Sequence, residues 1–300
     1  MKSQGAKSRN PIRRAWDFLL VVMQVLKFEH TIFALPFAYL GMVLAAQGLP
    51  TFWQFVWITV AMASARTIAM AMNRLVDREL DARNPRTAAR ALPRGLISPR
   101  AVVLITLIAF LFYELSAYEL NTFVLMLSPL ALIFLLSYHY TKRFTWLSHW
   151  VLGFTDGIAA PGAWAAVRGS LDIIPILLWI AVTLWIGGFD LIYACQDVEV
   201  DRREGLKSVP AVFGIPTALT LARINHALTI IVLAAVGVLA NLGGPFWIGW
   251  GGAAVLLAYE NSIVHPNDLS RLNLAFFNVN GYISILVFVG ALLGLWFPRL

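Results

Sequence analysis

Cysteine, histidine and charged residues are all scarce in this chain of 300 residues. The single cysteine, Cys195, excludes an intrachain disulfide. The five histidines are scattered without the spacing that a zinc site needs. Charged residues make up 13% of the chain, whereas hydrophobic residues make up 59%. A soluble domain could not bury so much apolar side chain, so the composition predicts a polytopic membrane protein.

Long apolar runs fill most of the sequence, and no polar linker is long enough to separate domains. Nine of the runs could each cross a hydrocarbon core of about 30 Å. They lie near 18–47, 52–72, 101–118, 121–139, 149–167, 173–194, 214–240, 245–260 and 274–297. The first run follows a basic tail without a small-residue cleavage site, so we expect a retained helix and not a signal peptide. The sequence therefore predicts one all-α membrane domain over 1–300, with nine transmembrane helices after a basic cytoplasmic tail at 1–16.

A polar cluster, "AMNRLVDRELDARNPRT" at 71–87, follows the second predicted span. Asn73, Asp77 and Asp81 are four residues apart, so on a helix they share one face. Charges this close to a membrane core are expensive and are usually functional. We therefore interpret this cluster as part of a site.

A second cluster, "YACQDVEVDRREGLKSVP" at 193–210, follows the sixth predicted span. Asp197 and Asp201 repeat the four-residue spacing, and Asp190 lies two turns earlier on nearly the same stripe. The matching positions suggest a duplicated helical unit, although the two halves are only weakly similar. Together the faces would gather at least four carboxylates at one end of a bundle.

Carboxylates gathered in a partly desolvated site repel each other strongly unless cations compensate them. Carboxylate and amide oxygens without histidine or thiol are the ligands that suit Mg²⁺. Basic residues near both clusters could then contact an anion, and they are Arg74, Arg78, Arg83, Arg86, Arg90, Arg94, Lys142, Arg143, Arg202, Arg203 and Lys207. A diphosphate fits this description, because it chelates magnesium and accepts paired hydrogen bonds from arginine.

The basic residues are also distributed unevenly about the predicted membrane. When the nine spans are threaded alternately, 18 of the 23 Lys and Arg residues fall on the side of the amino terminus. The positive-inside rule then puts the amino terminus and both acidic clusters in the cytoplasm and the carboxyl terminus outside, in an inner membrane of a prokaryote. The net charge of +7 reflects this topology and attraction to anionic lipid, so we expect a lipid bilayer and no nucleic acid as partner.

Both clusters resemble motifs of one family. "NRLVDRELDARNPRT" resembles the NxxxDxxxD motif of the UbiA superfamily of intramembrane prenyltransferases, and "YACQDVEVDRREGLKSVP" resembles its YxxxDxxxD motif. The resemblance covers nearly the whole chain. It implies a helical bundle around a central cavity that opens laterally to lipid. There an isoprenyl diphosphate and an acceptor would meet beneath a cap formed by the two motif loops.

The resemblance also implies roles for individual residues. Residues that match magnesium and diphosphate ligands are Asn73, Asp77, Asp81, Asp197 and Asp201. Residues that match substrate contacts are Arg86, Arg90, Tyr138, Lys142, Tyr193 and Lys207. Asp190 matches a further cavity carboxylate, a possible base for the ring proton or an orienting group.

Arg66 stands seven residues before Asn73, where quinone-pathway members of the family have an arginine that faces the aromatic acceptor. An arginine inside an apolar span needs a partner, and an aromatic carboxylate would be one. The alternative is a structural ion pair, in which Arg66 binds Asp190 or Glu29 and holds helices together.

Within the family, "NPRTAARALPRG" and "NDLSRLNLAFFNVNGYIS" are most similar to 4-hydroxybenzoate polyprenyltransferases and to enzymes that prenylate a naphthoate in menaquinone synthesis. We expect Mg²⁺-dependent transfer of a prenyl group from an isoprenyl diphosphate to a ring carbon of an aromatic acid. The acceptor is expected to be 4-hydroxybenzoate, in ubiquinone or menaquinone biosynthesis. A naphthoate stays open, because cavity volume cannot be read from sequence, as do prenyl chain length, oligomeric state and the residue that takes the ring proton.

Two other classes of membrane protein use intramembrane carboxylates. CDP-alcohol phosphotransferases would carry a DGxxAR segment before the last DxxxD, and this sequence has none. An ion-coupled transporter would hold its acids at the membrane midplane, in helices broken by glycine or proline. Here the acids lie at span ends and are followed by arginines, which favours the prenyltransferase.

Overall fold

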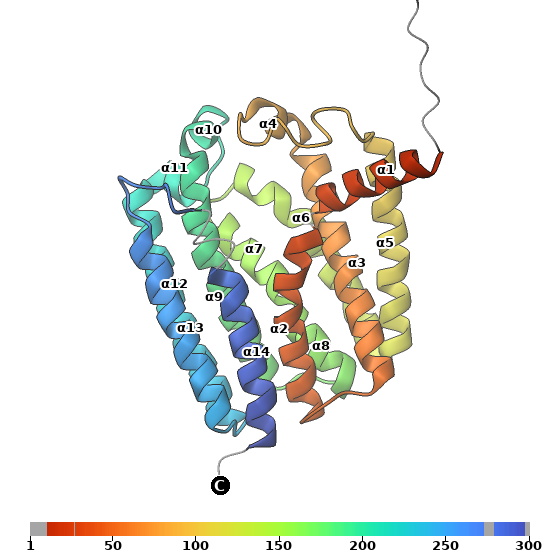
Figure 1. Ribbon diagram of the computed structural model, residues 1–300, viewed down its shortest axis with the longest axis vertical. Coiled ribbons are helices and arrows are strands. Elements are labelled where there is room, and N and C mark those ends of the chain that lie inside the picture. The colour runs from red at the N-terminus through yellow and green to blue at the C-terminus, as the bar shows by residue number, and fades with distance from the viewer. Residues whose placement is uncertain (1–10, 27, 273–278, 298–300) are drawn as a thin grey trace, which may run out of the picture.

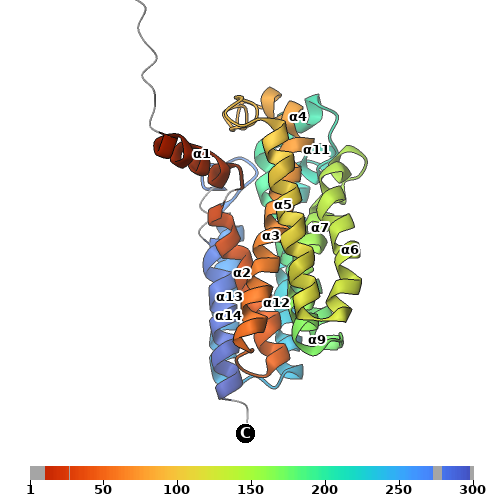
Figure 2. The same ribbon diagram turned by 90° about the vertical axis from the view of Figure 1, so that its right-hand side faces the viewer.

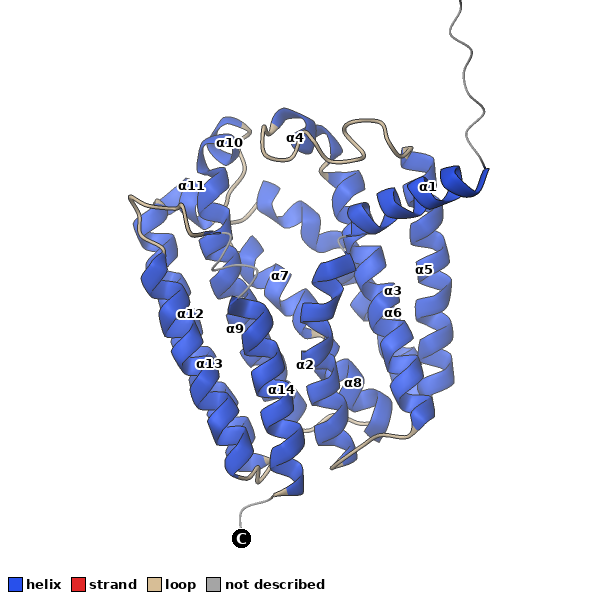
Figure 3. Cartoon of the chain, viewed as in Figure 1, coloured by secondary structure: helices blue, strands red, loops and turns tan. Residues whose placement is uncertain are grey.

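A computed structural model describes residues 11–26, 28–272 and 279–297. This part of the chain is all-helical and has no strand, only an isolated bridge between His265 and Asp268 (Figure 3). The longer helices run side by side as a bundle, with short helices at one end (Figures 1 and 2). The predicted all-α class is therefore confirmed.

The described helices follow one another along the chain as follows. They are α1 (Pro11–Leu26), α2 (Phe28–Ala46), α3 (Phe52–Val76), α4 (Arg78–Arg83), α5 (Pro99–Leu120), α6 (Thr122–Ser137), the 3₁₀ helix η1 (Tyr138–Arg143), α7 (Ser148–Gly157), α8 (Ala159–Arg168), α9 (Ile173–Ala194), the 3₁₀ helix η2 (Cys195–Asp197), α10 (Val198–Arg203), α11 (Val209–Phe213), α12 (Ile215–Leu239), α13 (Gly244–Ile263) and α14 (Asn280–Trp296).

Within the part of the chain that the structure describes, five helical segments are long and apolar enough to cross a membrane. They are Phe52–Val76, Pro99–Leu120, Thr122–Arg143, Ile173–Arg203 and Ile215–Leu239, and shorter apolar helices span Leu35–Ala46 and Asn280–Trp296. On α5 the large side chains of Leu104, Leu107 and Leu111 are exposed along one face. A long row of exposed leucines is the surface that lipid covers in a membrane protein.

Two predicted spans are not single helices. The first, 18–47, is divided into α1 and α2, which run in different directions (Figure 1). Residues 11–16 of the predicted tail belong to α1, and residues 1–10 lie outside the described residues. The fifth span is divided at Ile158, between α7 and α8. Pro161 explains this break, because it has no N–H to donate to the carbonyl four residues earlier.

Close packing of α9 against its neighbours positions the site. Gly188 of α9 lies against the ring of His226 on α12, and a Cβ atom there would collide with the ring. Gly153 of α7 lies against the backbone carbonyl of Thr183 on α9 in the same way. Glycine at these two contacts lets α7 and α12 approach α9 closely.

Both acidic clusters lie at one end of the bundle. The short helices α4 and α10, which follow the first aspartate of each cluster, are at the top of Figure 1, whereas the end of α14 is at the bottom. Alternate threading of the nine predicted spans through the membrane also predicts that both acidic clusters lie on one side.

Candidate active site

Each motif bends at its first aspartate. Asp77 separates α3 from α4, and Asp197 ends the 3₁₀ turn that separates α9 from α10. Their backbone angles are almost equal, with φ −96° and ψ 9° at Asp77 and φ −104° and ψ 6° at Asp197. This region of backbone space is sparsely occupied and is common in active sites. The two motifs therefore share a local geometry as well as a spacing.

Asp77 is buried and paired with two cations of η1. The Nζ atom of Lys142 lies 3.0 Å from its Oδ2 atom, and Nη2 of Arg143 lies 2.9 Å from its Oδ1 atom. Asn73, one turn earlier, donates to Oδ2 at 3.3 Å. The 3₁₀ helix η1, which follows the apolar helix α6, thus delivers its two terminal cations to the first motif.

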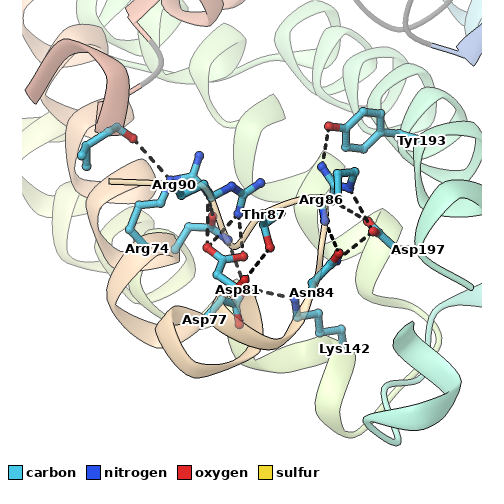
Figure 4. A network of polar contacts seen from close by, with 12 residues as sticks. Arg74, Asp77, Asp81, Asn84, Arg86, Thr87, Arg90, Lys142, Tyr193 and Asp197 are labelled. Atoms are coloured by element: carbon cyan, nitrogen blue, oxygen red, sulfur yellow. Dashed lines mark hydrogen bonds and ion pairs between the residues drawn. The ribbon is translucent and has the colours of Figure 1, made fainter. Parts of the chain in front are cut away.

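Asp81 is buried and paired with an arginine of the loop 84–98. Nη1 of Arg90 lies 2.7 and 2.8 Å from the two carboxylate oxygens of Asp81 (Figure 4). Nη1 of Arg74 is 3.9 Å from the same carboxylate and donates to Asn73 at 3.1 Å. The loop after the first motif therefore folds back and neutralises it.

The same loop also reaches the second motif. Nε of Arg86 donates to Oδ1 of Asp197 at 2.9 Å while its Nη2 contacts Oδ2, and Asn84 donates to Oδ1 at 3.0 Å (Figure 4). Arg86 also donates to the Tyr193 hydroxyl at 3.0 Å and lies over that ring. Partial burial disfavours the charged guanidinium, but the hydrogen bonds to Asp197, together with the attraction of Tyr193, Asp197 and Asp81, outweigh it and raise the pKa of Arg86. Arg86 therefore ties the two motifs together.

The remaining two acids are held by neutral side chains. Ser208 donates to Asp201 at 2.6 Å. Asp190 lies 2.7 Å from Nδ1 of His149. The backbone N–H of Val209 donates to Nε2 of that imidazole at 3.2 Å. Because Nε2 accepts, Nδ1 carries the proton and donates it to Asp190.

One partly open pocket, with a volume of about 250 Å³, collects most of the predicted site. Its polar lining includes Asn73, Asp77, Asp81, Asn84, Arg86, Arg90, Tyr138, Lys142, His149, Asp190, Tyr193, Asp197, Asp201 and Ser208. Lys207 does not line it: the Lys207 side chain is exposed, and its backbone N–H donates to the carbonyl of Lys142 at 2.7 Å. Of the residues to which the family resemblance assigns roles, all except Arg66 and Lys207 therefore line one space. The further basic candidates do not line it, and they are Arg74, Arg78, Arg83, Arg94, Arg143, Arg202 and Arg203.

Arg66 lines a second, mostly apolar cavity of about 120 Å³ between α3, α5, α6 and α8. Its Nη1 atom lies 3.5 Å from Oδ2 of Asp156 on α7, and its buried Nε atom has no partner among the described residues. The partner is thus Asp156 and not Asp190, while the side chain of Glu29 lies outside the described residues. Arg66 therefore lines an apolar cavity with a buried Nε–H that has no partner among the described residues.

The pocket of both motifs has the donor chemistry of a magnesium site. Its acidic and amide side chains offer only oxygens for a cation, and this set fits Mg²⁺. In the described part of the chain no three Asp, Glu, His or Cys side chains converge closely enough to hold an ion. Asp77, Asp81 and Asp197 are each neutralised by lysine or arginine instead.

Sequence reasoning missed three residues of these cavities. Asn84 follows Asp81 by three residues, one helical turn, and could have been added to the first motif. His149 and Asp156 lie seven residues apart inside the fifth predicted span. Polar side chains within an apolar span were already the signal that singled out Arg66, and the same signal applies to them.

Comparison with known proteins identifies the family. The model of the UbiA prenyltransferase family matches residues 34–297. The chain belongs to this family. It is 35% identical over 247 residues to a 4-hydroxybenzoate octaprenyltransferase of Xanthomonas oryzae pv. oryzae (strain PXO99A), with 82% of each chain covered. It is 32% identical over 255 residues to the enzyme of that name from Aeromonas salmonicida (strain A449), with 85% of this chain and 88% of the relative covered.

Solved structures have the same fold. The apo structure of a UbiA homologue from Aeropyrum pernix K1 superposes with a TM-score of 0.81 at 33% identity, over 88% of this chain and 98% of that one. A UbiA homologue from Archaeoglobus fulgidus bound to GPP and Mg²⁺ superposes with a TM-score of 0.63 at 20% identity, over 89% and 99%. The predicted family is confirmed, and the chain is an integral membrane prenyltransferase.

Proposed function

We propose that this UbiA prenyltransferase transfers a polyprenyl group from an isoprenyl diphosphate to a ring carbon of 4-hydroxybenzoate, with Mg²⁺, in quinone biosynthesis. The observation that carries the proposal is the single pocket in which the acids of both motifs face Arg86, Arg90 and Lys142. The relatives named for 4-hydroxybenzoate support the acceptor, and the GPP and Mg²⁺ of the Archaeoglobus homologue support the donor and the metal.

Mg²⁺ would be held by the oxygens of the two motifs, from Asn73, Asp77, Asp81, Asp197 and Asp201. When bound, it supplies positive charge that stabilises the departing diphosphate. Arg86, Arg90 and Lys142 already lie at the pocket wall, where their N–H groups can bind and orient phosphate oxygens. To do so they exchange a carboxylate partner for a phosphate partner.

Other polar residues of the chain bind the aromatic acceptor and take its proton. The allylic carbon–oxygen bond breaks, its electron pair leaves with the diphosphate, and the ring carbon beside the phenolic oxygen bonds to the allylic carbon. Asp190 takes the ring proton, and the Nδ1–H of His149 fixes the carboxylate that receives it. Arg66, which pairs with Asp156 only through Nη1 and has an unpartnered Nε–H, binds the acceptor carboxylate. The apolar walls around Arg66 exclude water that would capture the cation.

We place the enzyme in a prokaryotic inner membrane, as nine spans around a central cavity, with the amino terminus and both motifs in the cytoplasm. The row of exposed leucines on α5 and the uneven distribution of lysine and arginine support this placement. A cytoplasmic pocket gives a soluble aromatic acid direct access to the site.

Purified protein in lipid nanodiscs tests the proposal with geranyl or longer diphosphates and a panel of aromatic acids, with product masses as the readout. We expect a prenylated 4-hydroxybenzoate that forms with Mg²⁺ and does not form with EDTA. A prenylated naphthoate as the sole product would overturn the acceptor assignment, and undiminished turnover in EDTA would overturn the metal.

A further inference from the structure

The helix α1 has an orientation that differs from the rest of the bundle. It crosses the bundle at a steep angle, near the end that carries α4, whereas α3 and α5 run lengthwise (Figures 1 and 2). It has 16 residues, so its length is roughly 24 Å at about 1.5 Å per residue. A helix this short and this steeply inclined cannot span a hydrocarbon core of about 30 Å.

One face of α1 is packed against the protein. Val25 is buried and joins Val21, Val22 and Leu26 in a cluster with residues of α3, α5 and the loop between α4 and α5. Nε of Arg74 donates to the backbone carbonyl of Val25 at 3.4 Å. The carboxyl-terminal half of α1 is therefore fixed beside the first motif.

The opposite face of α1 is apolar and uncovered. Trp16, Leu19, Leu20 and Met23 follow the i, i+3, i+4, i+7 spacing of one helical stripe, and each leaves between 40% and 60% of its surface exposed. Four large apolar side chains in a row form an exposed apolar stripe beside polar residues of the helix such as Gln24, which is also exposed. Something apolar must cover this stripe in the native state.

The sequence beside the stripe shows what kind of partner fits. Arg13 and Arg14 stand in the first turn of α1, Lys2, Lys7 and Arg9 precede it, and no acidic residue occurs before Asp17. A second copy of the chain would bring the same positive charges to this face and repel it. An apolar stripe that starts at a tryptophan and follows a basic segment matches a membrane surface with anionic headgroups.

We propose that α1 is an interfacial helix whose stripe of Trp16, Leu19, Leu20 and Met23 lies in the lipid surface at the motif end of the bundle, where anionic headgroups attract the basic sequence that leads into the stripe. The contact reaches the pocket through Arg74, which bonds the Val25 carbonyl, donates to Asn73 at 3.1 Å and lies 3.9 Å from Asp81. Anionic lipid therefore stabilises the position of the first motif.

A fluorophore that reports polarity tests the depth of α1. Cys195 is buried and is the single cysteine, so Cys195→Ala gives a background in which Leu20→Cys is labelled alone. Matched controls are Leu111→Cys, on the exposed leucine row of α5, and Glu199→Cys, on the exposed side of α10. Each protein is placed in phosphatidylcholine nanodiscs, with or without roughly a third phosphatidylglycerol, and lipid-attached quenchers sit near the headgroup or near the chain end.

We expect the label at Leu20 to be quenched most by the headgroup-side quencher, the label at Leu111 most by the deep quencher, and the label at Glu199 by neither. Phosphatidylglycerol should blue-shift the Leu20 label, and Arg13→Gln with Arg14→Gln should remove that shift. A Leu20 label that neither quencher reaches would overturn the proposal, as would one shielded only in discs that hold two copies. A blue shift that survives both arginine substitutions would overturn the role of anionic headgroups.

Discussion

Arg86 and Asp197 form a two-point ion pair that joins the loop after the first motif to the second motif across 111 residues of sequence. Arg90 pairs with Asp81 and Lys142 pairs with Asp77. Together these three pairs compensate the negative charge of Asp77, Asp81 and Asp197. The repulsion among these acids is therefore relieved within the chain in this structure, and Mg²⁺ stays a proposal. The chain's own basic side chains relieve it, so Mg²⁺ has to compete with them.

This competition predicts how the enzyme responds to metal removal. EDTA should abolish turnover but leave the melting temperature in nanodiscs unchanged, because the ion pairs hold the pocket without metal. Mg²⁺ added together with an unreactive diphosphate analogue should raise the melting temperature. In Asp197→Ala this rise should be lost. A large drop in melting temperature with EDTA alone would show that the metal is structural.

The motif aspartates should be necessary for the reaction, unlike neighbouring acids. We expect Asp77→Ala, Asp81→Ala, Asp197→Ala and Asp201→Ala each to lower turnover at least about a hundredfold, the scale of a lost electrostatic contact in an active site. The cations paired with Asp77 and Asp197 are partly exposed, so their loss of a partner should not unfold the bundle.

Two exposed glutamates are matched controls for the motif aspartates. Glu79 is on α4, two residues from Asp81, and Glu199 is on α10, two residues from both Asp197 and Asp201. Both side chains are exposed to solvent. Glu79→Ala and Glu199→Ala should retain wild-type turnover. If the two control variants lost as much turnover as the aspartate variants, the motif acids would act through their overall negative charge and not as specific ligands.

Asp190 and His149 should affect the chemical step more than substrate binding. We expect Asp190→Asn to lower kcat roughly a hundredfold, within the usual range for a lost general base, with little change in KM for the diphosphate. His149→Gln should lower kcat less, because it removes only the group that orients Asp190. Asp172→Asn, at the amino-terminal cap of α9, is the control and should affect neither constant. A raised KM with unchanged kcat in Asp190→Asn would exclude it as the base.

The sequence predicted the composition of the pocket better than its internal pairing. Spacing of four residues keeps Asp77 and Asp81 beside the same pocket although the helix is interrupted at Asp77, because the backbone N–H of Asp81 still bonds to the Asp77 carbonyl. The partners of these acids depend on how distant helices pack: Lys142, which pairs with Asp77, lies 65 residues from it in the sequence. Hydropathy likewise located the apolar segments, but it did not distinguish α1 from a span, because a helix that lies in the lipid surface is also rich in apolar residues.

Arg66 should select the acidic acceptor. Lysine at this position keeps the charge but not the forked donor, so Arg66→Lys should raise KM for the aromatic acid much more than KM for the prenyl diphosphate. Arg66→Ala should lose most turnover. Asp156→Asn removes the charge that pairs with Arg66, and it therefore distinguishes acceptor binding by Arg66 from an ion pair that joins α3 to α7. If the ion pair only holds α3 to α7, both Arg66→Lys and Asp156→Asn should lower the melting temperature and leave both KM values unchanged.

The side of the membrane on which the motifs lie is tested by labelling introduced cysteines. Because Cys195 is buried, it should not react with a membrane-impermeant maleimide, and an introduced thiol can be read against a silent background. Arg94 and Lys207 are exposed at the motif end, in the loops after α4 and after α10. Leu49 is exposed in the turn between α2 and α3, at the opposite end.

The positive-inside rule predicts that Arg94→Cys and Lys207→Cys react only in inverted vesicles, whereas Leu49→Cys reacts in intact cells. Labelling of Arg94→Cys in intact cells would reverse the topology and remove direct access of a cytoplasmic aromatic acid to the pocket.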